Sequence, residues 1–167
     1  YLETKDKKTT LLSLLQSLPI TSAIVFVNHR STAIELSDLL RRNHILSSAF
    51  SGYFDERKRI AIMSDFRKGD IRVLVATDAA ARGIDIHELS HVIHYDIPKS
   101  LESYYQETGR AGRDGGEGYC LAFYDPKDID KLEKFLAQKP VSEREIGLQL
   151  LNEVVGYAET SMNRRQY

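Results

Sequence analysis

The chain has 167 residues, of which 42% are apolar and 28% are charged, and its net charge is -1. Such a composition is typical of one globular domain with a hydrophobic core, and no apolar run approaches the ~20 residues of a membrane span. The small net charge excludes a global positive field, so any nucleic-acid binding must come from individually placed groups. The single cysteine, Cys120, excludes an internal disulfide and a multi-cysteine zinc site in this span and fits a reducing cytosol.

Apolar, β-rich segments alternate with amphipathic segments along the chain. Strands are expected at residues 23–27, 46–50, 72–76, 91–95 and 118–124. Helices are expected after a cap at Ser31 and at residues 56–66, 99–106, 125–138 and 146–161. This alternation predicts an α/β fold, with a mostly parallel sheet that has helices on both faces.

The C-terminal part is expected to lead out of this domain. Residues 1–138 contain all the predicted strands, whereas residues 139–145 have the composition of a connecting segment. Residues 139–167 are therefore predicted to be a connection and a helix that leads toward a following domain. The chain begins at Tyr1 and not at a methionine, as expected for a piece of a longer protein.

Two of the predicted strands are followed by groups that suit a phosphate chain. Ligands of parallel sheets bind at the carboxyl ends of the strands. Arg30 follows the first strand at a helix start, where the helix dipole disfavours a cation, so a phosphate contact and a merely solvated arginine are both open. Gly52 follows the second strand; taken alone it favours a simple turn, although the same opening could admit a phosphate chain.

Residues 75–86 read VATDAAARGIDI and follow the third strand. Thr77 could donate to a phosphate, while Gly83 and the three alanines leave room for a nucleic-acid backbone. Asp85 could accept hydrogen bonds from ribose hydroxyls. The alternative is a tight strand-to-helix turn with Asp78 as its cap.

Residues 106–118 read QETGRAGRDGGEG and hold five of the ten glycines. Arg110 and Arg113 stand three residues apart among them, and a guanidinium group matches the oxygens of a transferring phosphoryl group. Glycines at 109 and 112 would leave room for a triphosphate or a neighbouring domain. A glycine-rich turn with solvent-exposed arginines is the alternative, and it does not explain the arginine spacing.

The sequence has no phosphate loop of the form GxxxxGK[ST] and no acidic pair after a strand to hold Mg²⁺. If the arginines act on ATP, the nucleotide and Mg²⁺ must be bound mainly by another domain. The five histidines show no metal-ligand spacing, so no metal site is predicted in this chain. His94 ends a predicted buried strand, which favours packing over catalysis.

Residues 24–30, 75–85 and 106–113 resemble motifs IV, V and VI of superfamily 2 helicases, in that order. The resemblance implies the second RecA-like domain of such a helicase, a three-layer sandwich of the P-loop NTPase type. It implies that Arg110 and Arg113 reach the γ-phosphate of ATP bound by an N-terminal RecA-like domain of the same polypeptide. Nucleotide contacts are implied for Asp85, Gln106 and Gly109, and nucleic-acid backbone contacts for Arg30, Gly52, Thr77 and Gly83.

The subfamily most similar to this chain is RecQ. Residues 96–115 resemble the RecQ version of motif VI, and residues 157–165 resemble the entry to the RecQ zinc-binding domain. Two features depart: residues 77–85 resemble the DEAD-box form of motif V, and Asn163 stands where RecQ proteins usually have their first zinc-ligand cysteine. Zinc is therefore expected in the longer protein at most, and not in this chain.

The RecQ resemblance implies an ATP-dependent DNA helicase that prefers DNA to RNA and works in a bacterial cytoplasm. Two alternatives stay open. The first is a DEAD-box-type RNA helicase, which motif V favours. The second is a non-catalytic nucleic-acid or protein-binding module, which the absence of a phosphate loop upstream would favour.

Overall fold

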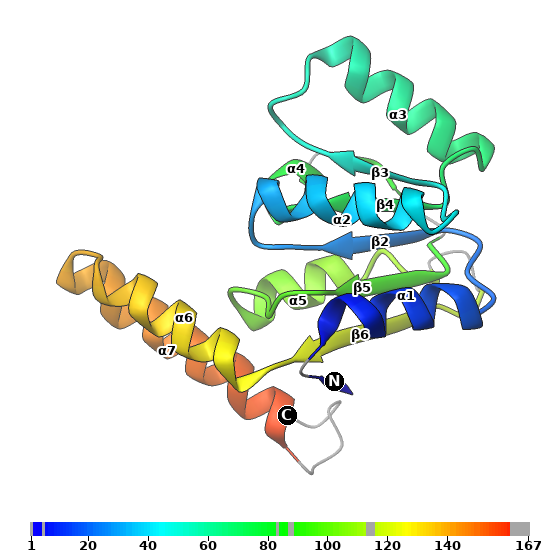
Figure 1. Ribbon diagram of the computed structural model, residues 1–167. Helices are drawn as coiled ribbons and strands as arrows, with labels where there is room; N and C mark the ends of the chain where they lie inside the picture. The colour runs from blue at the N-terminus through cyan, green and yellow to red at the C-terminus, as the bar shows by residue number, and fades with distance from the viewer. Residues whose placement is uncertain (1, 5, 83, 87–88, 113–115, 161–167) are drawn as a thin grey trace.

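The computed structural model describes residues 2–4, 6–82, 84–86, 89–112 and 116–160 (Figure 1). Its centre is a six-stranded sheet in the order β1-β6-β5-β2-β4-β3, and all neighbouring strands run parallel. The strands are β1 (Leu2–Glu3), β2 (Ala23–Phe26), β3 (Ser47–Phe50), β4 (Val73–Ala76), β5 (His91–His94) and β6 (Tyr119–Tyr124). The predicted parallel sheet is confirmed, and the short edge strand β1 was not predicted.

Helices occupy the segments between the strands and follow the last one. They are α1 (Lys7–Ser17), α2 (Arg30–Arg42), α3 (Glu56–Lys68), α4 (Asp78–Ala81), α5 (Leu101–Thr108), α6 (Pro126–Ala137) and α7 (Val141–Glu159). The expected cap at Ser31 is wrong, because the N-cap position is His29, two residues earlier, and its side chain makes no capping hydrogen bond. The alternative for residues 75–86 placed Asp78 as the cap of the following helix. The N-cap of α4 is instead Thr77, whose side chain accepts the capping hydrogen bond.

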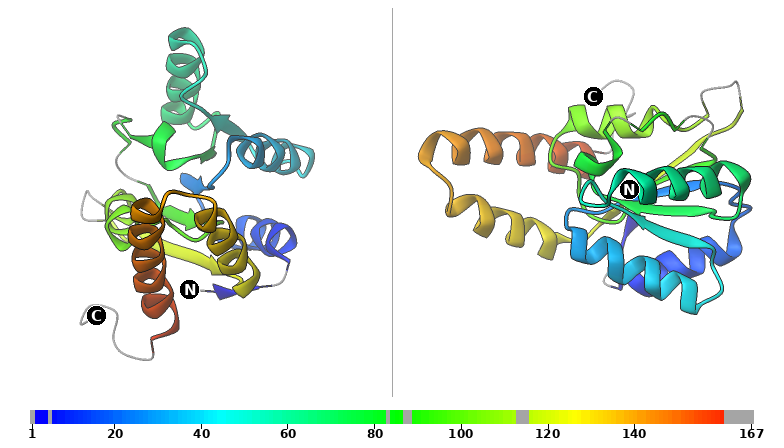
Figure 2. Two further views of the ribbon diagram at one scale, coloured as in Figure 1. Left: turned by 90° about the vertical axis from the view of Figure 1, so that its left-hand side faces the viewer. Right: turned by 90° about the horizontal axis from the view of Figure 1, so that it is seen from above.

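The sheet is covered on both faces, so the predicted three-layer arrangement is confirmed (Figure 2). Along β2, alternate side chains point to opposite faces, as the pleat of a strand requires. Val25 packs in one core cluster with Leu36 of α2, and Ile24 packs in the other with Met63 of α3. The continuous apolar strands therefore reflect burial on both faces.

Helices α6 and α7 form an antiparallel pair that extends from the carboxyl edge of the sheet (Figures 1 and 2). A Cβ at Gly147 would lie 2.5 Å from a methyl carbon of Leu136, so glycine permits the close packing of the two helices. Tyr157 of α7 packs against Tyr104 of α5, with 5.6 Å between ring centroids. Helix α7 starts at Val141, so the expected connection of residues 139–145 is mostly helical.

Candidate functional site

The carboxyl ends of β2, β4 and β5 meet at one edge of the sheet. β2 lies between β4 and β5, so the chain leaves β2 on one side and returns on the other. The loops that follow these strands start near Asn28, Thr77 and Asp96. Such a switch point opens a crevice in which α/β proteins bind ligands.

A cavity of about 220 Å³, the edge cavity, lies at this switch point. Its lining includes Arg30, Tyr53, Thr77, Asp78, Lys99 and Glu107. The structure therefore brings together two of the predicted nucleic-acid residues from separate strand ends. Gly52 immediately precedes Tyr53, and a Cβ there would meet nothing within 4 Å. Gly83 lies outside the described residues.

The polar groups of the edge cavity are set by local structure. Arg30 is the first residue of α2 and is exposed, with its guanidinium carbon 4.8 Å from the centroid of the Tyr53 ring. The Thr77 hydroxyl oxygen accepts a hydrogen bond from the Ala80 N–H at 3.4 Å. Because this bond uses the oxygen only as an acceptor, the hydroxyl hydrogen can still be donated to a ligand.

A buried histidine–glutamate pair forms one wall of the edge cavity. Nε2 of His94 and Oε2 of Glu107 lie 2.5 Å apart, and both side chains are almost completely buried. The His94 ring stacks on Phe26 with 5.2 Å between centroids, which fits the predicted packing role. Sequence reasoning missed Glu107, because glutamate is rarely buried and no local pattern marks its partner on another element.

Arg110 ties the end of α5 to the segment that follows β4. Its Nη1 donates to the carbonyl oxygen of Ile84 at 2.9 Å, and its Nη2 donates to that of Ala81 at 3.2 Å. The buried Nε has no hydrogen-bond partner among the described residues. The guanidinium is thus held in place by backbone, three residues after the Glu107 that borders the edge cavity. Arg113, its predicted companion, lies outside the described residues.

The other predicted nucleotide-binding residues are Gln106 and Gly109, at the C-terminal end of α5, and Asp85, which follows β4 and α4. Gln106 and Gly109 are exposed, and Gln106 donates to the Glu102 carboxylate at 3.3 Å. Asp85 follows Ile84 in the sequence but lines a separate cavity of about 380 Å³, together with Arg59 and Arg67 of α3. Among the described residues, the cavity that holds Asp85 does not include Gln106.

The glycines after Arg110 serve the loop itself. Gly112 has a φ of 67°, a left-handed conformation that favours glycine, and a Cβ there would lie 2.7 Å from the carbonyl oxygen of Gly116. A Cβ at Gly118 would lie 2.6 Å from the backbone of Ala111. The close approach of two parts of one loop therefore requires glycine at Gly112, while the expected space for a triphosphate or another domain stays a prediction.

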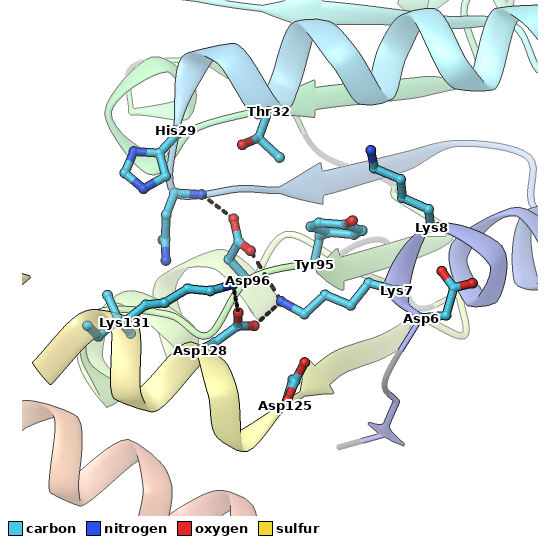
Figure 3. Close-up of a pocket in the computed structure, with 12 residues that line it drawn as sticks. Asp6, Lys7, Lys8, His29, Thr32, Tyr95, Asp96, Asp125, Asp128 and Lys131 are labelled. Carbon is cyan, nitrogen blue, oxygen red and sulfur yellow. Dashed lines mark hydrogen bonds and ion pairs between the residues drawn. The ribbon is translucent and has the colours of Figure 1, made fainter. Parts of the chain in front are cut away.

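A second cavity, of about 430 Å³, adjoins the edge cavity and is called the paired-charge pocket (Figure 3). Lys7 Nζ lies 3.3 Å from Oδ1 of Asp96 and also forms an ion pair with Asp128 of α6. Oδ2 of Asp96 accepts from the Asn28 N–H at 2.8 Å. Burial, reinforced by the carboxylates of Asp96 and Asp128, raises the pKa of Tyr95 to about 12. These contacts join α1, α6 and the ends of β2 and β5.

Neither a metal cluster nor a membrane span occurs in the part of the chain that the structure describes. No group of three histidine, cysteine, aspartate or glutamate side chains is placed to hold a metal ion there. No helix of the described residues is long and apolar enough to cross a bilayer. Asn163, at the expected position of a zinc ligand, lies outside the described residues.

The sequence matches the family described as the helicase conserved C-terminal domain over residues 6–115. It is 39% identical over 136 residues to the ATP-dependent RNA helicase eIF4A of Kluyveromyces lactis, covering 80% of this chain and 34% of that protein. It is 40% identical over 123 residues to the ATP-dependent RNA helicase FAL1 of Coccidioides immitis, covering 74% of this chain and 31% of that protein. The chain thus spans about a third of the length of these relatives.

Solved structures with the same fold include two DEAD-box proteins. The E. coli DEAD-box protein SrmB, bound to the regulator of ribonuclease activity A, is 34% identical with a TM-score of 0.72 over 81% of this chain and 83% of that chain. The C-terminal domain of the DEAD-box protein Dbp5 is 27% identical with a TM-score of 0.69 over 89% of this chain and 96% of that chain. The RecA-like fold predicted from the motifs is confirmed.

These similarities correct the expected subfamily. The relatives and structures above are RNA helicases or DEAD-box proteins, so they support the DEAD-box alternative better than the RecQ prediction and its preference for DNA. The curated relatives above are fungal and give no support to the expected bacterial cytoplasm. The RecQ prediction rested on residues 96–115, whereas the DEAD-box form of motif V at residues 77–85 agrees with these relatives.

Proposed function

We propose that this chain, which belongs to the helicase conserved C-terminal domain family, is the second motor domain of an ATP-dependent RNA helicase of the DEAD-box type. The edge cavity is the observation that carries this proposal, because it combines Arg30, Thr77 and the loop at Gly52 at the switch point of the sheet. RNA is favoured because the relatives eIF4A and FAL1 are ATP-dependent RNA helicases.

The edge cavity offers contacts that suit a nucleic-acid backbone. Arg30 and Lys99 are exposed, and neither has a carboxylate partner among the described residues. Their charges are thus available to phosphates, the Thr77 hydroxyl can donate a hydrogen bond, and Gly52 presents backbone without a side chain. Contacts to phosphate and sugar carry no sequence information, so we expect the domain to bind strands of many sequences.

The nucleotide is proposed to bind between this domain and an N-terminal RecA-like domain that holds the phosphate loop and Mg²⁺. Hydrolysis of ATP would supply the free energy of unwinding. Arg110 and Arg113 would present guanidinium groups to the phosphates, with Gln106, Gly109 and Asp85 bordering the nucleotide. The backbone contacts of Arg110 support this role, because a guanidinium that is already held in place loses little freedom when it meets a phosphate.

Helix α5 offers a physical link between the two ligands. Glu107 borders the edge cavity through its contact with His94, and Arg110 lies one helical turn further along the chain. A shift of α5 would therefore move a wall of the nucleic-acid site and an ATP-facing guanidinium together.

We propose that residues 139–167 continue toward a following domain.

DNA remains a second candidate substrate, because residues 96–115 resemble the RecQ version of motif VI and contribute Glu107 to the wall of the edge cavity. Unwinding of a 3′-tailed DNA duplex and of an RNA duplex by the full-length protein separates the two. RNA-dependent unwinding supports the DEAD-box proposal. Unwinding of DNA alone would overturn it in favour of the RecQ alternative.

The motor role is tested by ATP hydrolysis in the full-length protein. Arg110→Ala and Arg113→Ala should each lower kcat by orders of magnitude, since arginine fingers contribute about 10³–10⁵-fold in other nucleotide hydrolases. Arg41→Ala is the control, because Arg41 of α2 is exposed, pairs with Asp38 and lies outside the motifs and the edge cavity. Unchanged kcat in both variants, with thermal melts like the wild type, would remove the finger role. The 167-residue chain alone should hydrolyse ATP negligibly.

A further inference from the structure

Tyr53 is the most exposed large apolar or aromatic side chain in the described part of the chain, at 82% of its full accessibility. It lies in the loop between β3 and α3 and lines the edge cavity. A ring this exposed adds almost no hydrophobic stabilisation to the folded domain. Its position beside the groups proposed to bind phosphates therefore calls for a ligand with an apolar face.

The loop that carries Tyr53 is fixed by its own hydrogen bonds. The Tyr53 N–H donates to Oγ of Ser51 at 3.2 Å, and the Phe54 N–H donates to the Ser51 carbonyl oxygen at 3.1 Å. Asp55 then caps α3 by accepting from the Lys58 N–H at 2.8 Å. The ring is thus presented on a short, anchored loop, which lowers the entropic cost of binding.

Arg30 lies against the same ring. Its guanidinium carbon is 4.8 Å from the Tyr53 centroid, within the range of a cation–π contact. One side of the ring is thereby braced by the cation, while the high exposure of Tyr53 leaves ring surface open to another planar group. The arrangement unites an aromatic platform and a phosphate-binding cation, the two elements with which proteins hold single strands.

We propose that Tyr53 stacks on one nucleobase of a single strand bound in the edge cavity, and that Arg30 braces the ring while contacting a phosphate. This inference rests on the proposed nucleic-acid function and adds a base contact to an interface otherwise made with the backbone. Because every base has a π-face, the contact strengthens binding without specifying a sequence. It gives the domain a means of holding one nucleotide in place on the cavity.

A tryptophan at this position reports the stacking directly. The chain contains no tryptophan, so Tyr53→Trp introduces a single indole fluorophore. Titration with a single-stranded RNA oligonucleotide should quench or shift its emission, whereas an abasic strand of the same length should bind with little change in emission. Equal emission changes with both strands would overturn the stacking contact.

Affinity gives an independent test with a matched control. Tyr53→Ala should weaken binding of the normal strand about tenfold and leave binding of the abasic strand unchanged. Phe135→Ala is the control, because Phe135 is also exposed and has the Lys139 ammonium 5.4 Å from its centroid, but does not line the edge cavity. It should bind both strands like the wild type.

The outcomes separate this inference from the proposed function. Equal weakening of the normal and abasic strands by Tyr53→Ala would overturn the base contact. Wild-type affinity of Tyr53→Ala, together with weaker binding by Arg30→Ala, would overturn stacking and leave the backbone site standing. A wild-type domain that binds neither RNA nor DNA strands at low salt would overturn the proposed function as well.

Discussion

The edge cavity and the paired-charge pocket lie next to each other on one edge of the sheet, and both are bordered by Asn28 and Asp96. They use charge in opposite ways. In the paired-charge pocket the mostly buried Lys7 ammonium lies between two carboxylates, those of Asp96 and Asp128. In the edge cavity Arg30 is exposed and contacts an aromatic ring.

The difference teaches which of two polar cavities is suited to a polyanion. Charges that neutralise each other in a partly buried site hold elements of the fold together and have little attraction left for a ligand. Exposed cations without carboxylate partners keep their attraction for phosphates. Cavity size alone would favour the larger pocket, of about 430 Å³, over the edge cavity, of about 220 Å³.

The largest expected effect is on the paired-charge pocket. Lys7→Met leaves the Asp96 and Asp128 carboxylates without their shared cation, so we expect the free energy of unfolding to fall by about 3 kcal/mol. Urea unfolding measures this change, with the neighbouring exposed Lys8→Met as a control that should stay within about 0.5 kcal/mol. If Lys7→Met unfolds like the wild type, the ion pairs of Lys7 contribute as little to stability as exposed surface pairs, which contradicts this prediction.

The next effect appears at alkaline pH. The pKa of Tyr95 in the folded protein is about 12, above its ordinary value of 10.0, so the folded state keeps the proton longer than the unfolded state. The resulting stabilisation, on the order of 2 kcal/mol, is fully present below pH ~10 and is lost as the pH rises toward the folded pKa.

Unfolding free energies of the wild type and Tyr95→Phe between pH 9 and pH ~12 isolate this contribution. Lysines titrate in the same range in both proteins, so their effect cancels in the difference. The wild type should lose more stability than the variant across this range. Parallel stability curves would contradict the effect of burial and of the two carboxylates on Tyr95.

The smallest effect in free energy falls on the edge cavity. Arg30→Ala should change stability by less than about 0.5 kcal/mol, because Arg30 is exposed and stands at the unfavourable end of the helix dipole. The affinity of this variant for single strands should fall about tenfold. The slope of its binding constant against salt concentration should fall by about the value of one phosphate contact. Arg42→Ala, at the other end of α2, is the matched control, and an equal loss of affinity in both would point to a nonspecific field.

The sequence predicted the sheet well because its central strands are continuous apolar runs. Residues 23–27 differ from β2 by one residue. Strand β1 was missed because two residues carry no periodic signal, and it forms only by pairing with the distant β6. The start of α7 was placed at Ile146 and not at Val141, because its first turn is polar and exposed and Pro140 precedes it.

The candidate site was predicted in part, because its motifs directly follow the apolar strands that the sequence reveals. Motifs at strand ends placed Arg30 and Thr77 at one edge, and the parallel topology brought them to one cavity. The backbone partners of Arg110 and the burial of Glu107 against His94 could not be predicted, because they depend on contacts between segments far apart in the sequence. Tyr53 was not predicted as a site residue, because its exposure is a property of the folded loop.

The most direct test of the contrast between the two cavities is the change in backbone amide NMR shifts when a single-stranded RNA oligonucleotide is added to this 19.0 kDa chain. Binding at the edge cavity predicts the largest changes at Arg30, Gly52, Tyr53 and Thr77, with small changes at Asp128 in α6. Large changes around Lys7 and Asp128, with the loop at Gly52 and Tyr53 unaffected, would contradict the assignment of the edge cavity as the nucleic-acid site.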